Sequence, residues 1–422
     1  MTFVELILRF TKDSEAPRKF YYWSALAGIS AVIKNNIWLD QFQNNQKLYP
    51  NIFVLLVGKP GIRKGPPVVL ISNLVDGVDN TRVFSGRATI QGIINELSKA
   101  VTKKSGGPPI TDSCGALFAL EFASFLVHDK STFLTLMDLY DGHYNPNWGY
   151  TLKNSAMIRL KRPFLTLLGA TNEINLKEIL PEHAVGGGFL ARSCIIFATK
   201  KAGINPMTRR IETGVTMEML QDRLIAISKL KGEIKWSDAA RDAYEAWYID
   251  YQKDTEAIEN DSTGIMERLH THIVKTSVLL SLSRGDDLII SLEDLNEAMI
   301  ACRDFIPGSK RVALGQIGKS VSSAGTAVLL KELINRDPHE ITHEEALRKH
   351  WMHFDTFELA KISESLFAQK AIAIKFRRSD NETATVYILN PAVLERLGQS
   401  VESDSGKPEA KAKDKPKDKH KN

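Results

Sequence analysis

The sequence has few cysteines and no long apolar run. Its three cysteines, Cys114, Cys194 and Cys302, stand far apart and match neither the spacing of a zinc site nor a disulfide framework. No apolar stretch approaches the roughly 20 residues that a helix needs to cross a bilayer. Near the N-terminus, Glu5 and Arg9 interrupt the apolar positions. We therefore expect a cytoplasmic protein with no membrane partner and no signal-peptide core.

Neither sign of charge dominates the sequence. The 55 Lys and Arg residues exceed the 50 Asp and Glu residues by five, a balance that is compatible with nucleic acid as a partner and does not require it. The hydrophobic content of 43% and charged content of 25% are ordinary for a globular protein. The 422 residues allow two or three domains, and no internal repeat is visible.

What the sequence does contain is a glycine-rich loop after a short apolar run. Residues 54–67 read VLLVGKPGIRKGPP, so Gly58 and Gly61 precede Lys64. In such loops backbone N–H groups surround phosphates and the lysine reaches the outer ones. A Ser or Thr hydroxyl usually follows and holds Mg²⁺, but Gly65 stands there, which puts efficient hydrolysis in question. We predict that ATP and Mg²⁺ bind here. The expected nucleotide contacts are Gly58, Lys59, Pro60, Gly61, Ile62, Arg63, Lys64, Gly65 and Pro66.

Four short apolar segments, at 52–57, 115–120, 163–169 and 194–198, alternate with segments of helical periodicity. Strands that are apolar throughout are typical of a parallel sheet covered by helices on both faces. The predicted fold class is therefore α/β. Because ligands bind at the carboxyl ends of the strands in such sheets, polar residues near the ends of these segments are candidates for a site.

Three such residues join Lys64 as predicted catalytic residues. Glu121 follows the second segment, where a carboxylate can hold Mg²⁺ or polarise the attacking water, the alternative being a surface glutamate. Asn172 follows the third segment and can bind that water or the γ-phosphate, unless it is a plain turn residue. Arg192 precedes the fourth segment and can enter a neighbouring protomer's site to stabilise transition-state charge, or form a structural salt bridge.

Basic residues elsewhere indicate further contacts. Arg268 and Lys275 stand seven apart on a helical segment and share a face, so Arg268 either contacts the nucleotide or belongs to a solvated face. Segment 141–162 mixes aromatic and basic residues, which can stack bases and grip phosphates. A structural insertion is the alternative. The nucleic-acid candidates there are Trp148, Lys153, Arg159, Lys161 and Arg162.

We expect the chain to divide into five parts. These are an N-terminal helical segment (1–45), a P-loop ATPase core (46–212), a helical subdomain (213–310), a winged-helix domain (324–396) and a disordered charged tail (397–422). Three short helices followed by a β-hairpin are the layout of a winged helix. Its hairpin carries Lys375, Arg377 and Arg378, which we expect to contact nucleic acid.

Several short motifs follow one another along the chain. They are YYWSALA at 21–27, PNIFVLLVG at 50–58, GIRK at 61–64, LEFASFL at 120–126, LYDG at 139–142, LLGAT at 167–171 and GGFLAR at 187–192. In their order and spacing they resemble the phage and prokaryotic P-loop ATPases that are grouped, as a domain of unknown function, with primase-associated and RepA-like replicative helicases. Gly65 departs from the Ser or Thr that is usual in that family.

The resemblance implies a RecA/AAA-like core in which Lys64 binds phosphate, Glu121 is the Walker B acid and ligand of Mg²⁺, Asn172 is the sensor and Arg192 is the finger. It implies an ATP-dependent DNA helicase or translocase of phage or mobile-element DNA replication. Such a protein acts as a ring, expected to be a hexamer with nucleotide between protomers, in the host cytoplasm if a phage encodes it. Its partners would be single-stranded DNA and a primase or other replication proteins.

Two other interpretations stay open. Gly65 favours a nucleotide-binding replication initiator, loader or DNA-binding adaptor that hydrolyses little or no ATP. A defence or regulatory ATPase on the same core is the third interpretation. All three place a nucleotide at Lys64.

Overall fold

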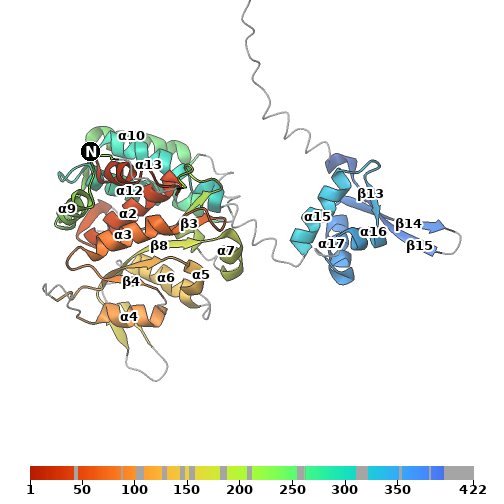
Figure 1. The fold of residues 1–422 in the computed structure, drawn as a ribbon, viewed down its shortest axis with the longest axis horizontal. Helices are drawn as coiled ribbons and strands as arrows, with labels where there is room; N and C mark the ends of the chain where they lie inside the picture. Colours follow the sequence, from red (N-terminus) through yellow and green to blue (C-terminus); the bar gives the residue numbers. More distant parts are fainter. Residues whose placement is uncertain are drawn as a thin grey trace, which may run out of the picture. The chain divides into compact units, whose positions relative to one another are not determined.

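Figure 1 shows the computed structural model of the chain. The structure describes residues 1–41, 46–86, 89–100, 109–125, 131–142, 148–151, 157–180, 188–206, 212–253, 261, 263–309, 322–350, 354–379 and 382–393. The chain divides into two compact units, Met1–Gln316 and Ile317–Asn422, each with an apolar core of its own. Among the described residues, no helix has both the length and the apolar composition that crossing a membrane requires.

A five-stranded, all-parallel sheet forms the centre of the larger unit. In spatial order its strands are β4 (Val83–Ser85), β5 (Cys114–Ala119), β8 (Phe164–Thr171), β3 (Phe53–Gly58) and β9 (Ser193–Ala198). The predicted α/β class and parallel sheet are confirmed, and four of the five strands fall on the predicted apolar segments. β4 is not predicted, because it has only three residues and is partly exposed.

Because the strands run in one direction, the sheet has two different edges. We call the end where the strands finish, after Gly58, Ala119, Thr171 and Ala198, the carboxyl edge, and the end where they begin the amino edge. β3 lies between β8 and β9, and β5 follows β8. The loops that leave β3, β5 and β8 therefore meet at the carboxyl edge.

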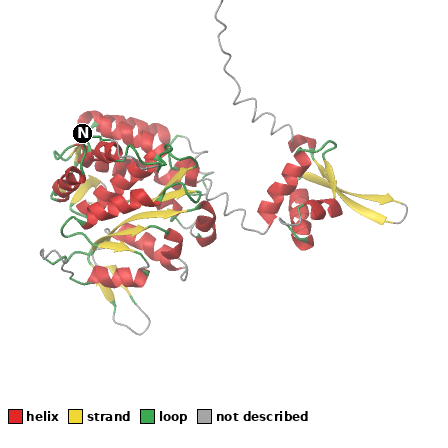
Figure 2. Cartoon of the chain, viewed as in Figure 1, coloured by secondary structure: helices red, strands yellow, loops and turns green. Residues whose placement is uncertain are grey.

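Side chains of β3 alternate between two apolar cores, as the period of a strand requires. Val54 and Leu56 belong to one core, and Phe53, Leu55 and Val57 to the other. The first core contains α1 (Phe3–Phe10), α2 (Arg18–Ile33), α3 (Gly65–Asp76), α9 (Met217–Ser228), α10 (Asp238–Tyr251), α12 (Ile265–Arg284) and α13 (Leu292–Arg303). The second contains α4 (Ile90–Ser98), α5 (Phe122–Phe125), α6 (Ser131–Asp141) and α7 (Glu173–Ile179). Helices thus cover both faces of the sheet (Figure 2).

Two local predictions about helices have different outcomes. α4 begins as predicted, with the Thr89 hydroxyl accepting the backbone N–H of Gly92. The expectation of helix throughout 1–45 is wrong for Ile37–Gln41, which forms β1 and pairs with β2 (Gln46–Leu48) and β10 (Gly232–Glu233). Likewise, β10, β11 (Lys235–Trp236) and β12 (Ile289–Ile290) interrupt the region expected to be helical. These short strands pair segments far apart in the sequence, and local periodicity does not register such pairing.

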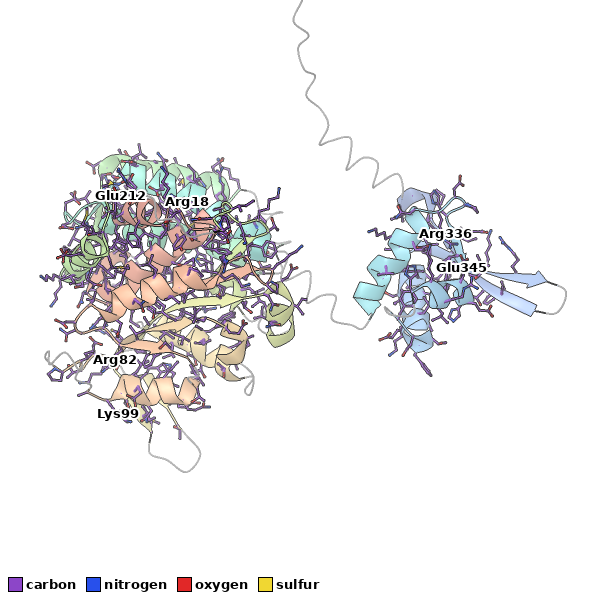
Figure 3. The ribbon with its side chains drawn as sticks, in the orientation of Figure 1. Arg18, Arg82, Lys99, Glu212, Arg336 and Glu345 are labelled. Carbon is purple, nitrogen blue, oxygen red and sulfur yellow. The ribbon has the colours of Figure 1, made fainter. Side chains whose placement is uncertain are left out.

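In its described part, the smaller unit combines helices with an antiparallel sheet. The helices are α15 (Ser322–Ile334), α16 (His343–Lys349) and α17 (Thr356–Ala368), and the strands are β13 (Glu340–Thr342), β15 (Glu382–Leu389) and β14 (Ile372–Ser379) in spatial order. Arg336 donates hydrogen bonds to Glu332 and Glu345, which joins α15 to α16 (Figure 3). The helices and hairpin that we predicted are present, and β13 adds a third strand. The predicted charged tail lies outside the described residues.

Candidate functional site

The loop between β3 and α3 has a backbone suited to binding an anion. Gly61 (φ +83°) and Arg63 (φ +66°) are left-handed, whereas Lys64 is right-handed helical. An alternation of this kind can turn N–H groups to one side of a loop, although the N–H of Ile62 already donates to the carbonyl oxygen of Lys59 at 3.3 Å, and α3 begins directly afterwards at Gly65. Pro66 and Pro67, in the first turn of α3, contribute no N–H. The donors are therefore concentrated in the loop itself.

The glycines of this loop serve different purposes. A Cβ at Gly58 would lie 2.8 Å from the carbonyl oxygen of Ala198, so the neighbouring strand requires a glycine there. Gly61 is required by its positive φ. At Gly65 the nearest atom to a Cβ would be Leu120 Cδ2 at 3.9 Å. The space for a Ser side chain therefore exists at the position where the hydroxyl is missing.

Lys64 is half-buried and spans the loop. Its ammonium donates to the carbonyl oxygens of Gly58 at 2.8 Å and Lys59 at 3.0 Å, which uses two of its three N–H donors. Burial lowers the pKa of Lys64 below its ordinary value, and the negative charge of Glu121 opposes that shift. The structure thus brings the predicted lysine and the predicted acid to the same place.

Glu121 and Asn172 lie at the carboxyl edge, as their positions after strands predicted. The Thr171 hydroxyl donates to Glu121 Oε1 at 3.3 Å and so links the ends of β8 and β5. Asn172 Oδ1 accepts the N–H of Asn175 at 2.8 Å and caps α7, the conformational role that turn chemistry offers. Thr171 is a site residue that sequence reasoning missed, although its hydroxyl directly precedes Asn172.

A second missed group lies beside the loop. Glu15, between α1 and α2, accepts hydrogen bonds at Oε2 from Lys201 Nζ (2.7 Å) and Arg63 Nε (3.1 Å). Its Oε1 accepts the N–H of Asn205 at 3.1 Å. The hydrogen bond from Lys201, followed by those from Asn205 and Arg63, lowers the pKa of Glu15 to about 2. Glu15 therefore holds two cations next to Lys64, across sequence separations that no local motif reveals.

Arg192 lies at the amino edge, because β9 begins just after it. Its Nε and Nη2 donate to Asp141 Oδ2 at 2.9 and 2.5 Å, and its Nη1 donates to the carbonyl oxygen of Gly188 at 3.0 Å. Within one chain the arginine is thus salt-bridged and stands at the opposite end of β9 from the loop of Lys64. Contact with a nucleotide would require a second copy of the chain.

Of the two basic residues predicted to share a face of α12, Lys275 is buried and Arg268 is partly exposed. Lys275 is 1% exposed, donates to Asn51 Oδ1 at 2.8 Å and to the Asn51 carbonyl at 3.1 Å, and lies 3.9 Å from the ring centroid of Tyr140. Burial lowers the pKa of Lys275 to about 7. The positive charge of Arg268 acts on both Lys275 and Tyr140. Arg268 therefore lies near the amino edge, away from Lys64 of the same chain, and its predicted contact with a nucleotide stays a prediction that would need a second copy of the chain.

The aromatic and basic insert contains the hairpin β6 (Trp148–Tyr150) and β7 (Ile158–Leu160). Trp148 is 8% exposed and stacks on Tyr150 at 5.9 Å, within the second core. It therefore packs as part of the structure and is not available to stack on bases, which corrects that prediction. The other candidates differ: Arg159, Lys161 and Arg162 are exposed, and Lys153 lies outside the described residues.

The hairpin of the smaller unit presents exposed basic residues. Lys375 and Arg377 are exposed on β14, and Arg377 pairs with Glu340 at 3.1 Å. Between them, Phe376 is 73% exposed. The side chain of Arg378 lies outside the described part of the structure. The predicted basic surface is thus present in part, with an aromatic ring that sequence reasoning did not single out.

The residues around Lys64 could hold a metal ion only if the phosphates of a nucleotide supplied some of its ligands. Among the described residues, no group of three or more His, Cys, Asp or Glu is placed to hold a metal ion. Mg²⁺ in nucleotide sites is held by one or two carboxylates, substrate phosphates and water. Glu121 can be such a carboxylate, and Thr171 lies beside it. A magnesium ion that arrives with a nucleotide is therefore compatible with the site.

These features define the class of the protein at a coarse level. The larger unit is an α/β domain with an all-parallel sheet, compatible with a Rossmann- or RecA-like core. A comparison with known protein families finds none whose model matches the chain, and a search of curated proteins finds no match. The argument for function therefore depends on the site itself.

Proposed function

We propose that the protein is an ATP-dependent DNA helicase or translocase. The observation that carries this proposal is the ammonium of Lys64, held across the loop at the end of β3 by the carbonyls of Gly58 and Lys59, with Glu121 on the neighbouring side. A cation on a loop that leads directly into a helix N-terminus is suited to a chain of phosphates. A carboxylate within electrostatic reach is suited to aligning the water that attacks the γ-phosphate.

In this proposal the groups at the carboxyl edge bind the nucleotide and prepare the attacking water. The N–H groups of the loop and Lys64 bind and orient the phosphates, and Lys64 balances the charge that develops during transfer. Glu121 would hold Mg²⁺, which supplies charge neutralisation at the β- and γ-phosphates, and would accept a proton from water. Arg63 and Lys201, held by Glu15, add positive charge beside the phosphates.

The proposal includes a ring, with a hexamer as the expected form. Arg192 stands at the other end of the sheet from Lys64, so a role at the nucleotide requires transfer from Asp141 of its own chain to the site of a neighbour. Such an arginine stabilises transition-state charge in trans. Single-stranded DNA would contact Arg159, Lys161 and Arg162, and the smaller unit, proposed as a winged helix, would contact nucleic acid or a replication partner such as a primase.

The test measures ATP hydrolysis with and without single-stranded DNA. Wild type should hydrolyse ATP faster when DNA is present, and Lys64→Ala should abolish that activity. Lys253→Ala, at an exposed position after α10, is the control and should behave as wild type. Hydrolysis that persists in Lys64→Ala, or that ignores DNA, would reject the proposal.

A second candidate function is a nucleotide-binding initiator, loader or adaptor with little hydrolysis. Gly65, which lacks the hydroxyl, and the donor-poor first turn of α3 favour it. The open space at Gly65 makes Gly65→Ser a sterically mild test. A large gain in turnover would identify the natural protein as a weakened ATPase, and an unchanged, negligible turnover with tight ATP binding would favour the adaptor.

A further inference from the structure

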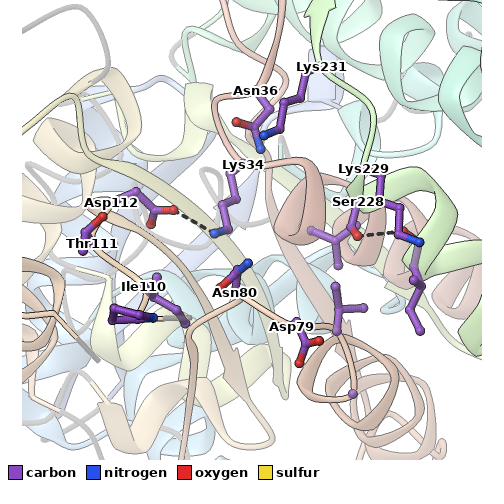
Figure 4. Close-up of a pocket in the computed structure, with 15 residues that line it drawn as sticks. Lys34, Asn36, Asp79, Asn80, Ile110, Thr111, Asp112, Ser228, Lys229 and Lys231 are labelled. Carbon is purple, nitrogen blue, oxygen red and sulfur yellow. Dashed lines mark hydrogen bonds and ion pairs between the residues drawn. The ribbon is translucent and has the colours of Figure 1, made fainter. Parts of the chain in front are cut away.

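A cavity of about 580 Å³ lies at the amino edge of the sheet. Its walls come from four separate parts of the chain: the end of α2, the turn after α3, the segment before β5 and the end of α9 (Figure 4). Sites for small molecules occupy roughly 300–1,000 Å³. Because α3 starts at the loop of Lys64 and ends at this cavity, the two places lie at opposite ends of that helix.

Lysines outnumber acids on the walls. The charged residues are Lys34, Lys229, Lys231, Asp79 and Asp112. Asp112 is already neutralised, because Lys34 Nζ lies 2.7 Å from its Oδ2 and the buried Arg82 lies 3.6 Å from its Oδ1. Lys229 and Lys231 then face a single carboxylate, that of Asp79. The cavity is therefore positively charged on balance.

Lys34, in the cavity wall, has an unusual backbone conformation. Its side chain is only 9% exposed, and its backbone (φ +55°, ψ −138°) is one that residues with a side chain rarely adopt. Strained backbone persists where the surroundings fix it and is concentrated at ligand sites. In Figure 4, Lys34 projects between Asp112 and Asn80, while Asn36 and Ser228 add uncharged polar groups.

The ends of three helices offer a competing explanation for these lysines. α2, α3 and α9 all finish at the cavity, and the negative end of a helix dipole favours a lysine nearby. However, one carbonyl in the last turn of each helix, that of Ser30, Asn73 or Ala226, already accepts a backbone N–H group, from Lys34, Gly77 and Lys229 respectively. The dipoles explain why Lys34 and Lys229 stand where they do. They do not explain why Lys231, Asn36 and Asn80 line the same space.

We propose that this cavity binds a small, multiply charged phosphate compound. Lysine ammonium groups are compact charges that bind phosphate well. Lys229 and Lys231 approach the space from one side, and Lys34, which also pairs with Asp112, approaches it from the other. Asn36 and Asn80 offer amide donors to the remaining phosphate oxygens. The site is separate from Lys64, so this inference does not depend on the proposed ATPase activity.

The test is calorimetric titration with inorganic pyrophosphate, carried out on Lys64→Ala so that the loop after β3 contributes less. One pyrophosphate should bind per chain. The double variant Lys229→Glu/Lys231→Glu should bind it about tenfold more weakly or worse. Lys235→Glu, an exposed lysine outside the cavity, should bind as tightly as the parent. Absence of binding to the parent, or equal binding by the double variant, would overturn the proposal.

Two further measurements separate the ligand from its alternatives. If the lysines serve the helix dipoles alone, the double variant should melt at a lower temperature and bind pyrophosphate unchanged, an outcome that also overturns the proposal. A 5′-phosphorylated oligonucleotide that competes with pyrophosphate and binds more tightly would overturn the proposal, because that result would identify the natural ligand as the phosphorylated end of a nucleic acid. Weaker binding of the oligonucleotide would support the small ligand. Failure of ATP hydrolysis would leave each of these results unaffected.

Discussion

Two lysines illustrate how the two edges of the sheet differ. At the carboxyl edge, Lys64 is half-buried, bonds carbonyls of its own loop and faces an exposed carboxylate. At the amino edge, Lys275 is almost wholly buried, bonds Asn51 twice and lies on the ring of Tyr140. The first arrangement leaves charge accessible to a ligand. The second arrangement buries the ammonium group of Lys275, whose hydrogen bonds to Asn51 connect α12 to the start of β3.

The same residue type therefore has opposite consequences at the two edges. A buried polar group without a partner is costly, so a residue such as Lys275 is expected to matter for stability. A half-buried cation in a loop, such as Lys64, costs less to remove and matters for binding. The following predictions compare the edges, beginning with the largest effect.

Replacement of the two lysines by methionine should separate stability from binding. Lys275→Met leaves both oxygens of Asn51 without a donor and should lower the free energy of unfolding by about 3 kcal/mol. Lys64→Met should lower it less, by about 1 kcal/mol, since of its carbonyl partners only Gly58 is buried and Lys59 is exposed. Urea titration followed by fluorescence, to which the buried Trp23 contributes, measures both. Equal losses would contradict the distinction between the edges.

The stability of wild type should also depend on pH through Lys275. Its pKa is about 7 in the folded chain, below the ordinary value of 10.5. Between these values the unfolded chain binds a proton that the folded chain does not, so stability should rise with pH. Buried thiols and tyrosines, such as Cys302 and Tyr140, have raised pKa values and reverse the trend at higher pH.

The difference between wild type and Lys275→Met isolates this contribution. Unfolding free energies measured from pH 7 to 8.5 should rise more steeply in wild type than in the variant. Parallel profiles would mean that Lys275 stays protonated in the folded chain.

Two glycines of the loop after β3 should differ in their effect on stability. Gly58→Ala forces a Cβ against the carbonyl of Ala198 and should cost about 2 kcal/mol of unfolding free energy. Gly65→Ala meets open space and should change stability by no more than about 0.5 kcal/mol. Both values come from the same urea titration. A loss of stability at Gly65 as large as that at Gly58 would show that a Cβ at position 65 clashes with its neighbours.

Much of the sheet could be predicted because its strands are continuous apolar runs. Lys64, Glu121 and Asn172 could be grouped without coordinates, since parallel strands deliver whatever follows them to one edge. The same logic fails for Arg268, whose position depends on how α12 crosses the sheet. Burial of Lys275 was equally hidden, because its partners Asn51 and Tyr140 lie more than a hundred residues away in the chain.

Alternation within short strands also limited the prediction. Trp148 has the composition of a base-stacking residue, yet β6 places it in the second core beside Tyr150. Nothing in the local sequence states which face of a three-residue strand is buried. Glu15 is a further case, since an acid in a turn between two helices gives no sign of partners at Arg63 and Lys201.

Glu15 provides the smallest expected effect, which is local. Its lowered pKa means that its stabilising interactions are complete above the ordinary value of 4.5 and are lost as pH falls toward 2. Glu15→Gln removes the negative charge that holds Arg63 and Lys201 at any pH. Hydrogen exchange at the amides of Ala202 and Asn205, which bond to Glu15, should therefore be faster in the variant at pH 7.

The matched control is Glu96→Gln, which removes the exposed ion pair with Lys99 on α4. It should leave the exchange of Ala202 and Asn205 unchanged, because it lies on the other face of the sheet. If the charge of Glu15 is what orders the segment after β9, wild type at pH 3 should approach the behaviour of Glu15→Gln after correction for the intrinsic exchange rate. Identical protection in wild type and Glu15→Gln at pH 7 would show that the backbone bond from Ala202 holds the segment alone, and that Arg63 and Lys201 are positioned beside the loop by other contacts.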